Sequence, residues 1–500
     1  GAGTEDHAEH ARRMEAAFYG IRLTGEFRSS DTLPAVTALW DVDALASWAE
    51  RDGGVFLGAA PHGPASDPRW IVARLPAAGA ESIEVRWVAA GRTTPGGLPE
   101  GLEGDSTGAL VIRTPRVLPG APEWRAVPAG GVRVGSVLRR TAIAWARQAP
   151  GAFALPAAAA VDWSLDPRAR VARLVPTLEW RAVGLVEHAG RLAWLVSGVA
   201  TVKRTPLALR QRFGEQDVAG AVPALIAAVD ADDGSVRIHL DPAADSLGIA
   251  WARTLGGLVG TAESLPSWIR NAMPYPGPWL GLQLGVLQQP HWGLGRQAVD
   301  PVSGESAPPS PVWGPSGPRL QVLLEDPATE TPAALLEVGR QDGVAVLERA
   351  VVSGSDLPSS REMGRNWRRA AAFTQLRDSM RAAGDTLLAG APRVHVGPDG
   401  ARSWQPFRAA GRRGDPALRW IGVAQGTMIG GGRTPEAAWR TLSAAGASGG
   451  GPVPFDVVNR FEAIRACVRR ADSALARGDL TAFSRAWEAV RGLLTEPPRA

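Results

Sequence analysis

The sequence has few cysteines and histidines, the residues that form disulfides in small domains and bind transition metals. Cys467 is the only cysteine among 500 residues, which excludes an internal disulfide framework and a cysteine-rich zinc site. We expect its thiol to be buried and inert in a helix. Only two of the seven histidines, His7 and His10, have the i, i+3 spacing of a helical metal site, and no third ligand is assigned. A solvated helix face is the simpler interpretation, so we predict no metal and no cofactor.

Lysine is almost absent, since Lys203 is the only one and the other basic residues are arginines. The 54 basic and 50 acidic residues leave a net charge of +4. The isoelectric point of about 10 therefore reflects the high pKa of arginine rather than a strongly positive surface. Nucleic-acid-binding proteins usually carry a concentrated basic stripe. We expect no nucleic-acid partner.

Long apolar runs are also missing. The longest stretches, 219–229 and 247–259, are short or interrupted by Arg253, and none approaches the roughly 20 apolar residues of a membrane helix. The start at Gly1, without a methionine, is compatible with a leader or anchor that has been removed. We expect no transmembrane helix in this chain.

Glycine, proline and tryptophan are plentiful, with 59, 41 and 19 residues. The length exceeds what one core usually holds, and the glycines and prolines predict many turns. We predict an α+β fold with antiparallel β-meanders, peripheral helices and a C-terminal helical hairpin. The expected divisions are an α+β region at 1–130, helices with a meander at 131–262, an irregular wrap or linker at 263–318, a second α+β region at 319–445, and the hairpin at 452–500.

Apolar periodicity and turn residues place the individual elements. Predicted helices cover 5–20, 135–147, 167–176, 361–383, 455–477 and 480–494. Predicted strands cover 55–57, 70–75, 83–88, 109–112, 182–187, 191–196, 224–229, 235–240, 394–396, 404–407 and 419–424, with further β structure at 320–352. The turns 188–190 and 230–234 make the strands from 182 to 240 the clearest meander.

Sequence motifs typical of catalytic or ligand-binding sites are weak or missing. The chain has no nucleophile elbow in a strand-to-helix setting and no phosphate loop. The run Gly430–Gly432, before Thr434 as a helix cap and Pro435 in the first turn, is compatible with an anion site, but a structural turn is the preferred interpretation. Asp230, Asp232 and Asp233 fit a hairpin turn better than a calcium loop. We therefore expect no enzymatic activity, no catalytic residues and no small-molecule substrate.

The tryptophans of the Pro/Gly-rich segment 263–318 are candidates for an interface. Such a segment is not expected to form a regular helix or a central strand, and Trp and Arg commonly anchor interfaces. The candidate interface residues are Trp268, Trp279, Trp292, Trp313 and Arg296. The alternative is that these side chains pin the segment to its own domain.

Eight segments, in order along the chain, resemble segments of one protein family. Their family counterparts are ATRKAYGL, LWD, GGVPLGSFFRR, DGRLYWIVDAYT, VVDAYDGTVTFYVVDP, MPxxLRxHLRYPEDLF, GPTLEEAL and a closing helical hairpin. The matching positions here are Ala16–Ile21; Leu39–Asp41; Gly130–Val132 with Gly135-Ser136 and Arg139-Arg140; Gly190–Leu192 with Trp194; Val229-Asp230, Asp233-Gly234 and Asp241-Pro242; Leu265-Pro266 and Tyr275-Pro276; Gly432–Ala437; and Leu475–Leu494. In this respect the chain resembles the UPF0182 proteins.

The resemblance implies an architecture and a location but no reaction. UPF0182 proteins are large bacterial membrane proteins with a long extracytoplasmic region after several membrane helices, and they have no established activity. This chain is similar to that region alone, as a separate version or a fragment of a longer protein. It departs from the family at Gly277-Pro278, where the family has acidic residues, and at Ser197–Ala200, where it has aromatic and polar ones. A polar functional site there would be lost in this chain.

The preferred functional hypothesis is a periplasmic or other extracytoplasmic scaffold or accessory subunit without enzymatic activity. It would dock on a bacterial membrane protein complex, such as a photosynthetic reaction-centre or antenna assembly or a respiratory assembly, with peripheral membrane contact. The first alternative is a module that binds a small ligand or envelope component in a groove. The second is a hydrolase of unrecognised type that uses scattered carboxylates.

Overall fold

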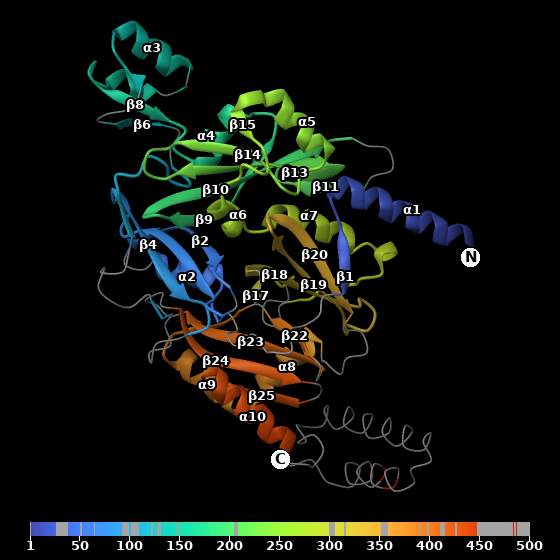
Figure 1. The fold of residues 1–500 in the computed structure, drawn as a ribbon. Helices are drawn as coiled ribbons and strands as arrows, with labels where there is room; N and C mark the ends of the chain where they lie inside the picture. Colours follow the sequence, from blue (N-terminus) through green and yellow to red (C-terminus); the bar gives the residue numbers. More distant parts are fainter. Residues whose placement is uncertain are drawn as a thin grey trace.

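A computed structural model gives the fold of the chain (Figure 1). It describes residues 2–447 apart from the gaps 27–38, 51–52, 65, 93–99, 102–109, 122–123, 128–131, 147, 149, 205–208, 300–305, 315–316, 352–358, 391, 398–399, 411–415 and 426–427, and beyond 447 it describes only Ser484 and Trp487. Within these residues, helices and mostly antiparallel sheets alternate along the chain, which confirms the α+β class.

The predicted meander forms the first sheet, in the order β15-β14-β13-β10-β9. The residues Ala189 and Gly190 connect β9 to β10, and both have positive φ, 52° and 76°. This two-residue turn suits the twist of a hairpin. The strand bounds are β9 (Glu179–His188), β10 (Arg191–Val202), β13 (Gly220–Asp230), β14 (Val236–Leu240) and β15 (Val259–Gly260).

The second sheet joins the N-terminal part of the chain to its middle. Its order is β1-β20-β19-β18-β16, with β17 also paired to β18, and β1 lies parallel to β20. Asp342 and Gly343, with φ of 53° and 84°, form the turn between β19 and β20. The strand bounds are β1 (Leu23–Glu26), β16 (Arg296–Gln297), β17 (Ser310–Gly314), β18 (Gly317–Glu325), β19 (Pro332–Gln341) and β20 (Val344–Val351).

Two further sheets lie on either side of a tryptophan-rich core. The third sheet has the order β2-β3-β4-β5, and the fourth has the order β21-β23-β24-β25 with β22 paired to β23. Their strands are β2 (Val55–His62), β3 (Arg69–Leu75), β4 (Ser82–Ala89), β5 (Leu110–Arg113), β21 (Thr386–Ala389), β22 (Arg393–Gly397), β23 (Gly400–Ala410), β24 (Pro416–Gln425) and β25 (Met428–Gly432). The predicted strands at 55–57, 70–75, 83–88, 394–396, 404–407 and 419–424 all fall within these strands.

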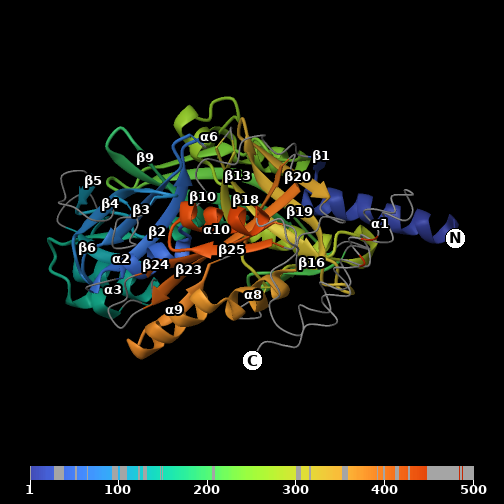
Figure 2. The same cartoon turned by 90° about the horizontal axis from the view of Figure 1, so that it is seen from below.

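Helices cover the sheets at several places. In the fourth sheet, α10 packs along β25 and β24, whereas α8 and α9 contribute to a separate core cluster with β23 and β24 (Figure 2). The helix bounds are α1 (Ala2–Tyr19), α2 (Val42–Ala49), α4 (Pro167–Leu174), α5 (Ser246–Leu255), α6 (Ser267–Ala272), α7 (Gly277–Leu287), α8 (Ser360–Arg369), α9 (Ala371–Ala382) and α10 (Pro435–Ala447). Shorter elements are η4 (Gly256–Leu258), η5 (Pro290–Trp292), β11 (Gln211–Phe213) and β12 (Gln216–Val218).

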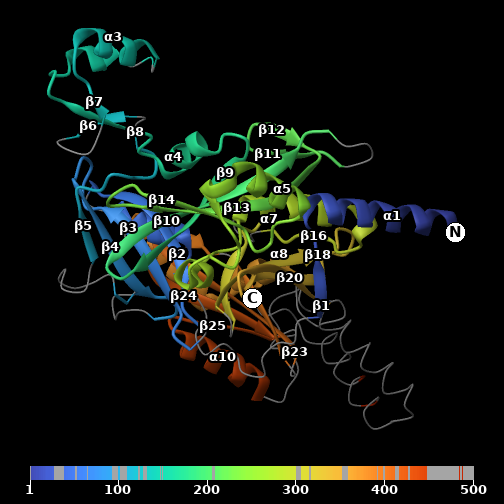
Figure 3. The ribbon, with the colours of Figure 1, turned by 45° about the horizontal axis from the view of Figure 1, so that its top comes forward.

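A small arm, residues 124–163, stands away from the rest of the molecule in two views (Figures 1 and 3). It consists of a three-stranded sheet in the order β6-β8-β7 and two helical segments. Its elements are β6 (Trp124–Val127), β7 (Val132–Arg133), α3 (Val137–Ala146), η3 (Pro150–Ala154) and β8 (Ala160–Trp163). The predicted helix 135–147 is confirmed as α3.

Two sequence predictions about helices are wrong. The segment 263–318 contains the regular helix α7, which is buried on most sides. Pro278 lies in its first turn, where backbone amides have no helical partner, and the following residues are apolar apart from Gln283, which suits a buried helix. The single helix predicted at 361–383 is two helices, α8 and α9, because Ala370 has extended ψ, 124°. The predicted hairpin 455–477 and 480–494 and its Cys467 lie outside the described residues, Ser484 and Trp487 excepted.

The hydrophobic cores cross the divisions expected from the sequence. One cluster combines Leu39 and Trp48 with Trp404 and Leu442, so residues near both ends of the described chain share one core. Strand β1 also pairs with β20. The expected boundaries therefore do not coincide with separate cores. Within the described residues, no helix is long and apolar enough to cross a membrane.

Candidate functional site: buried polar ties and an apolar hollow

The structure places two of the predicted interface residues in the interior. Trp279 is 2% exposed and Trp313 is 4% exposed. The Trp279 indole donates to the backbone oxygens of Tyr19 and Ala221, at 3.1 and 3.0 Å, and the Trp313 indole donates to the oxygen of His62 at 2.9 Å. These two side chains pin their segment to the rest of the chain, as the alternative interpretation states, and are not surface anchors.

The other three predicted interface residues reach the surface. Trp268 is partly exposed and stacks on His188, with ring centroids 5.1 Å apart. Trp292 is partly exposed and donates to the Glu15 carboxylate at 2.8 Å, which fastens η5 to α1. Arg296 is exposed in β16. A role of these three residues in an interface stays a prediction.

Three of the segments that carry the family resemblance meet in one buried polar tie. Tyr275, in the loop before α7, donates to the side-chain oxygen of Gln283 at 2.6 Å. Gln283 in turn donates to the backbone oxygen of Tyr19, at the end of α1, at 3.2 Å. Burial raises the pKa of the Tyr275 phenol well above its usual range, so it stays a neutral donor. The tie continues to Asp241 and Arg340, which form an ion pair with side chains 0% and 3% exposed.

A second tie closes the turn between β13 and β14. The Asp230 carboxylate accepts the backbone amides of Asp232 and Asp233, at 2.9 and 3.1 Å. Arg191 forms ion pairs with Asp230 at 2.9 Å and with Asp233 at 2.5 Å. Each carboxylate thus has a structural partner, and the interpretation of this sequence as a hairpin turn is confirmed.

The third tie is a buried cluster of one carboxylate and two guanidinium groups. Asp41 caps α2 by accepting the Ala44 amide at 3.0 Å and accepts from Arg408 of β23 at 2.6 Å. Arg393 of β22 is 2% exposed, and its guanidinium lies 4.7 Å from the ring centroid of Trp404. The cluster joins the N-terminal helix α2 to the fourth sheet.

Burial and neighbouring charges shift the pKa values of two groups in this cluster, Asp41 and Arg393. Burial opposes ionisation of Asp41, but the charge and hydrogen bond of Arg408, the Ala44 amide and the charge of Arg393 outweigh it and hold the pKa of Asp41 below its usual range. Burial lowers the pKa of Arg393 to about 9, against the attraction of Asp41. This value is still above neutral pH, so Arg393 stays protonated inside the protein.

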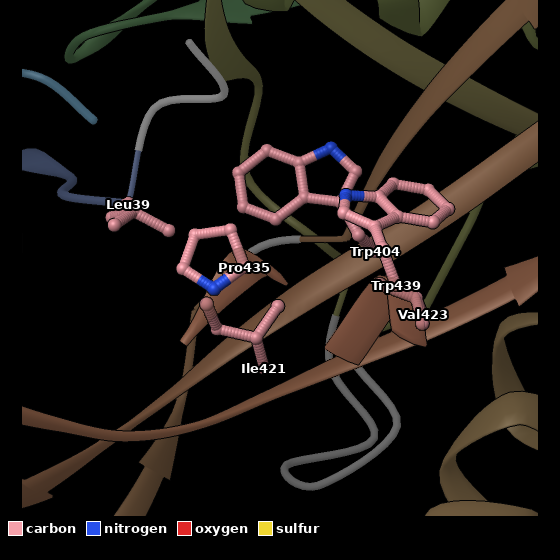
Figure 4. Close-up of a pocket in the computed structure, with 6 residues that line it drawn as sticks. All are labelled: Leu39, Trp404, Ile421, Val423, Pro435 and Trp439. Atoms are coloured by element: carbon pink, nitrogen blue, oxygen red, sulfur yellow. The ribbon is translucent and has the colours of Figure 1, made fainter. Parts of the chain in front are cut away.

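A small apolar hollow, with room for about one water molecule, lies beside this cluster and is partly open to solvent. Figure 4 shows the indole rings of Trp404 and Trp439 next to each other, with Leu39 and Pro435 on one side. The remaining lining residues are Ile421 and Val423 of β24. Leu39 and Pro435 belong to two further segments of the family resemblance, so this hollow, like the first tie, joins parts of the chain that are far apart in sequence.

The glycine run at 430–432 is neither an anion loop nor a turn, because it lies in strand β25. A β-carbon on Gly430 would lie 2.6 Å from the backbone nitrogen of Leu442 in α10, and one on Gly431 would lie 2.4 Å from the ring of Trp420. Glycine is required here because α10 and Trp420 lie against the strand from opposite sides. The predicted helix start is confirmed, since Thr434 accepts the amide of Ala437 at 3.2 Å and Pro435 opens α10.

The two places where the chain departs from the family pattern differ in environment. Ser197 is fully buried in β10, and a β-carbon on Gly198 would lie 2.8 Å from the ring of Trp180. Gly277 and Pro278 form the first turn of α7 and are exposed. Only the positions in β10 therefore serve the packing of the sheet.

In the part of the chain that the structure describes, no group of three His, Cys, Asp or Glu side chains lies close enough together to bind a metal ion. His7 and His10 are exposed on α1. Arginines 340, 393 and 408 were not singled out from the sequence. Each lies in a strand without a local motif, and its acidic partner is far away in the chain, 99 residues for Arg340 and 367 for Arg408.

The fold and its ties define an α+β framework in which segments far apart in sequence are fastened by buried polar contacts. The chain is a divergent relative of the UPF0182 proteins, to which it is similar over part of its length. It is 26% identical over 227 residues to a UPF0182 protein of Rhodococcus jostii, which covers 41% of this chain and 22% of the relative. It is also 26% identical over 226 residues to a UPF0182 protein of Mycobacterium tuberculosis, which covers 41% of this chain and 23% of the relative.

The chain thus spans less than a quarter of the length of these curated relatives. No family profile matches it, and no solved structure matches it.

Proposed function

We propose that the chain is a scaffold or accessory subunit without enzymatic activity that docks on a bacterial membrane protein complex and stabilises it. The observation that carries this proposal is the use of the polar residues in the family-like segments. Asp41, Tyr275 and Asp241 bind distant parts of the chain to one another, and Arg191 with Asp230 fixes a turn. Because these polar residues bind other parts of the same chain, they hold the fold in one arrangement. A rigid fold of this kind suits a docking protein.

The relation to UPF0182 proteins supports a place beside a membrane. The matching region in that family is expected to be extracytoplasmic and close to membrane helices. A separate chain with this framework would occupy the same side of the membrane and bind to membrane subunits of a photosynthetic or respiratory assembly. Trp268, Trp292 and Arg296 are the candidate contact residues, because they are exposed or partly exposed and their residue types are favoured at interfaces.

The test is purification of the tagged chain from its own membranes in a mild detergent, followed by native electrophoresis. We expect it to migrate with a large complex, and Arg296→Glu to weaken that association by reversing a charge at the surface. Arg237→Glu, which reverses an exposed arginine of β14 on another sheet, is the matched control. Migration of the wild-type chain free of every large complex would overturn the proposal.

A further inference from the structure

The arm exposes apolar side chains to an extent found nowhere else in the described residues. Its four most exposed large apolar side chains are also the four most exposed of the described molecule. They are Trp145 at 83%, Leu138 at 81%, Val137 at 66% and Phe153 at 52%. Scattered single exposures are normal, but a group of this kind marks an interaction surface.

The apolar face of α3 points away from the arm's own core. Leu138 and Trp145 are seven residues apart, so they lie on one side of the helix, about 10 Å apart along its axis. Ala144 is the only buried residue of α3, and Arg140 faces inward, where it donates to the backbone oxygen of Leu155 at 2.8 Å. The sequence pattern indicates an amphipathic helix, yet of its large apolar side chains only Ile143 is partly buried, and Val137, Leu138 and Trp145 lie on the outside.

Apart from Asp162 at its base, the charged residues of the arm are all arginines. Between residues 124 and 161 the sequence has five arginines and no acidic residue, in a chain whose total net charge is +4. Arg133 and Arg139 are exposed next to the apolar group. The one carboxylate in the arm, Asp162, is 8% exposed at its base, where Arg116 and Arg170 pair with it at 3.0 and 3.3 Å.

We propose that the tip of the arm inserts into the headgroup region of an anionic lipid bilayer. A Trp and Leu face flanked by arginines is the combination that lies in the membrane interface, with indole and aliphatic groups among the upper acyl chains and guanidinium groups on the phosphates. The absence of carboxylates from the sequence of the tip fits a negatively charged surface better than a protein surface of mixed charge. The arm projects from the rest of the molecule (Figure 3). It can therefore reach a bilayer while the rest of the molecule contacts other proteins.

This inference deepens the proposed function, on which it rests for the location at a membrane, but its test needs no partner complex. The full chain is mixed with protein-free vesicles of phosphatidylcholine alone or of equal parts phosphatidylcholine and phosphatidylglycerol, and bound protein is separated by flotation. We expect binding to the phosphatidylglycerol vesicles only, and weaker binding at higher salt because the charges are screened.

Two arm variants and two matched controls locate the contact. Leu138→Ala with Trp145→Ala should remove flotation, whereas Leu258→Ala with Leu388→Ala, which truncates two exposed apolar side chains of the body, should not change it. Arg133→Gln with Arg139→Gln should weaken binding about 25-fold, since each basic residue near an anionic surface contributes about fivefold. Arg237→Gln with Arg253→Gln, exposed on the body, should have a smaller effect.

Several results would overturn the lipid contact. The wild-type chain could fail to float with anionic vesicles, or the arm variants could float as well as the wild type. Arm variants that float normally but lose the large complex in native electrophoresis would show that the arm binds a protein. A dimer in lipid-free light scattering that the Leu138→Ala, Trp145→Ala variant abolishes would show that the arm binds a second copy. Flotation without any native complex would instead contradict the proposed function alone.

Discussion

The carboxylate of Asp241, just after β14, accepts two parallel hydrogen bonds from the guanidinium of Arg340 in β19, both at 2.9 Å. The pair joins the first sheet to the second, and its side chains are 0% and 3% exposed. Arg340 also donates to the backbone oxygens of Gly343, at 2.7 Å, and Pro274, at 3.3 Å. Such a fully enclosed pair stabilises one arrangement of the two sheets, because either partner alone would be a buried, unpaired charge.

Replacement of Asp241 by alanine should therefore be severe. We expect a loss of about 3–5 kcal/mol in the free energy of unfolding, since Arg340 would stay buried without its counter-ion. Urea unfolding followed by circular dichroism measures this loss. Glu330→Ala is the matched control, because it breaks the exposed ion pair with Arg361 and should cost less than about 1 kcal/mol. Equal losses of unfolding free energy in the two variants would mean that the buried ion pair stabilises the protein no more than the exposed one does.

Asp41 makes the stability of the folded protein depend on pH in the acidic range. Its pKa is held below the usual range in the folded protein, mainly by Arg408 against the effect of burial. Folding is then stabilised by this ionised carboxylate above its unfolded pKa of about 4, and the stabilisation is lost as pH falls through the lower folded pKa. We expect Asp41→Asn, which keeps the helix cap, to be less stable than the wild type at pH 7, with a difference that shrinks towards pH 2. A difference that is constant with pH would contradict this role.

Local chemistry explains which parts of the fold could be predicted from the sequence. Turn residues such as Ala189-Gly190 and Asp342-Gly343 fix hairpins within a few positions, so the sequence predicts the meander and the part of the second sheet formed by β18, β19 and β20. The tie between Asp41 and Arg408 was not, because nothing in the sequence selects one arginine among many across 367 residues. The apolar pattern of α3 gave the helix correctly but not the direction of its apolar face, which depends on what the arm packs against.

The glycines of β25 show how a correct local observation can lead to a wrong interpretation. A glycine run suggests a turn, but Gly431 is needed because the Trp420 ring lies where its β-carbon would be. We expect Gly431→Ala to cost about 1–3 kcal/mol through overpacking. Gly281→Ala is the control, because nothing lies within 4 Å of its β-carbon position in α7, and it should stabilise by about 0.5–1 kcal/mol. Thermal or urea unfolding measures the stability of both variants. A Gly431→Ala variant more stable than the wild type, with a Gly281→Ala variant less stable, would contradict the explanation.

The opposite environments of Trp279 and Trp145 distinguish a tryptophan that holds the framework from one that meets another surface. Trp279→Phe keeps the ring but removes the donor to the oxygens of Tyr19 and Ala221. It should cost about 1–3 kcal/mol, because both buried oxygens lose a donor and only that of Tyr19 keeps the donor from Gln283. Trp145→Phe, at a position 83% exposed, should change stability by less than about 0.5 kcal/mol. The ranking should reverse in vesicle flotation, where Trp145→Phe weakens binding and Trp279→Phe, assayed well below its unfolding midpoint, leaves it unchanged. If Trp279→Phe reduced flotation while the protein stayed folded, the segment 263–318 would have a surface role that its burial does not indicate.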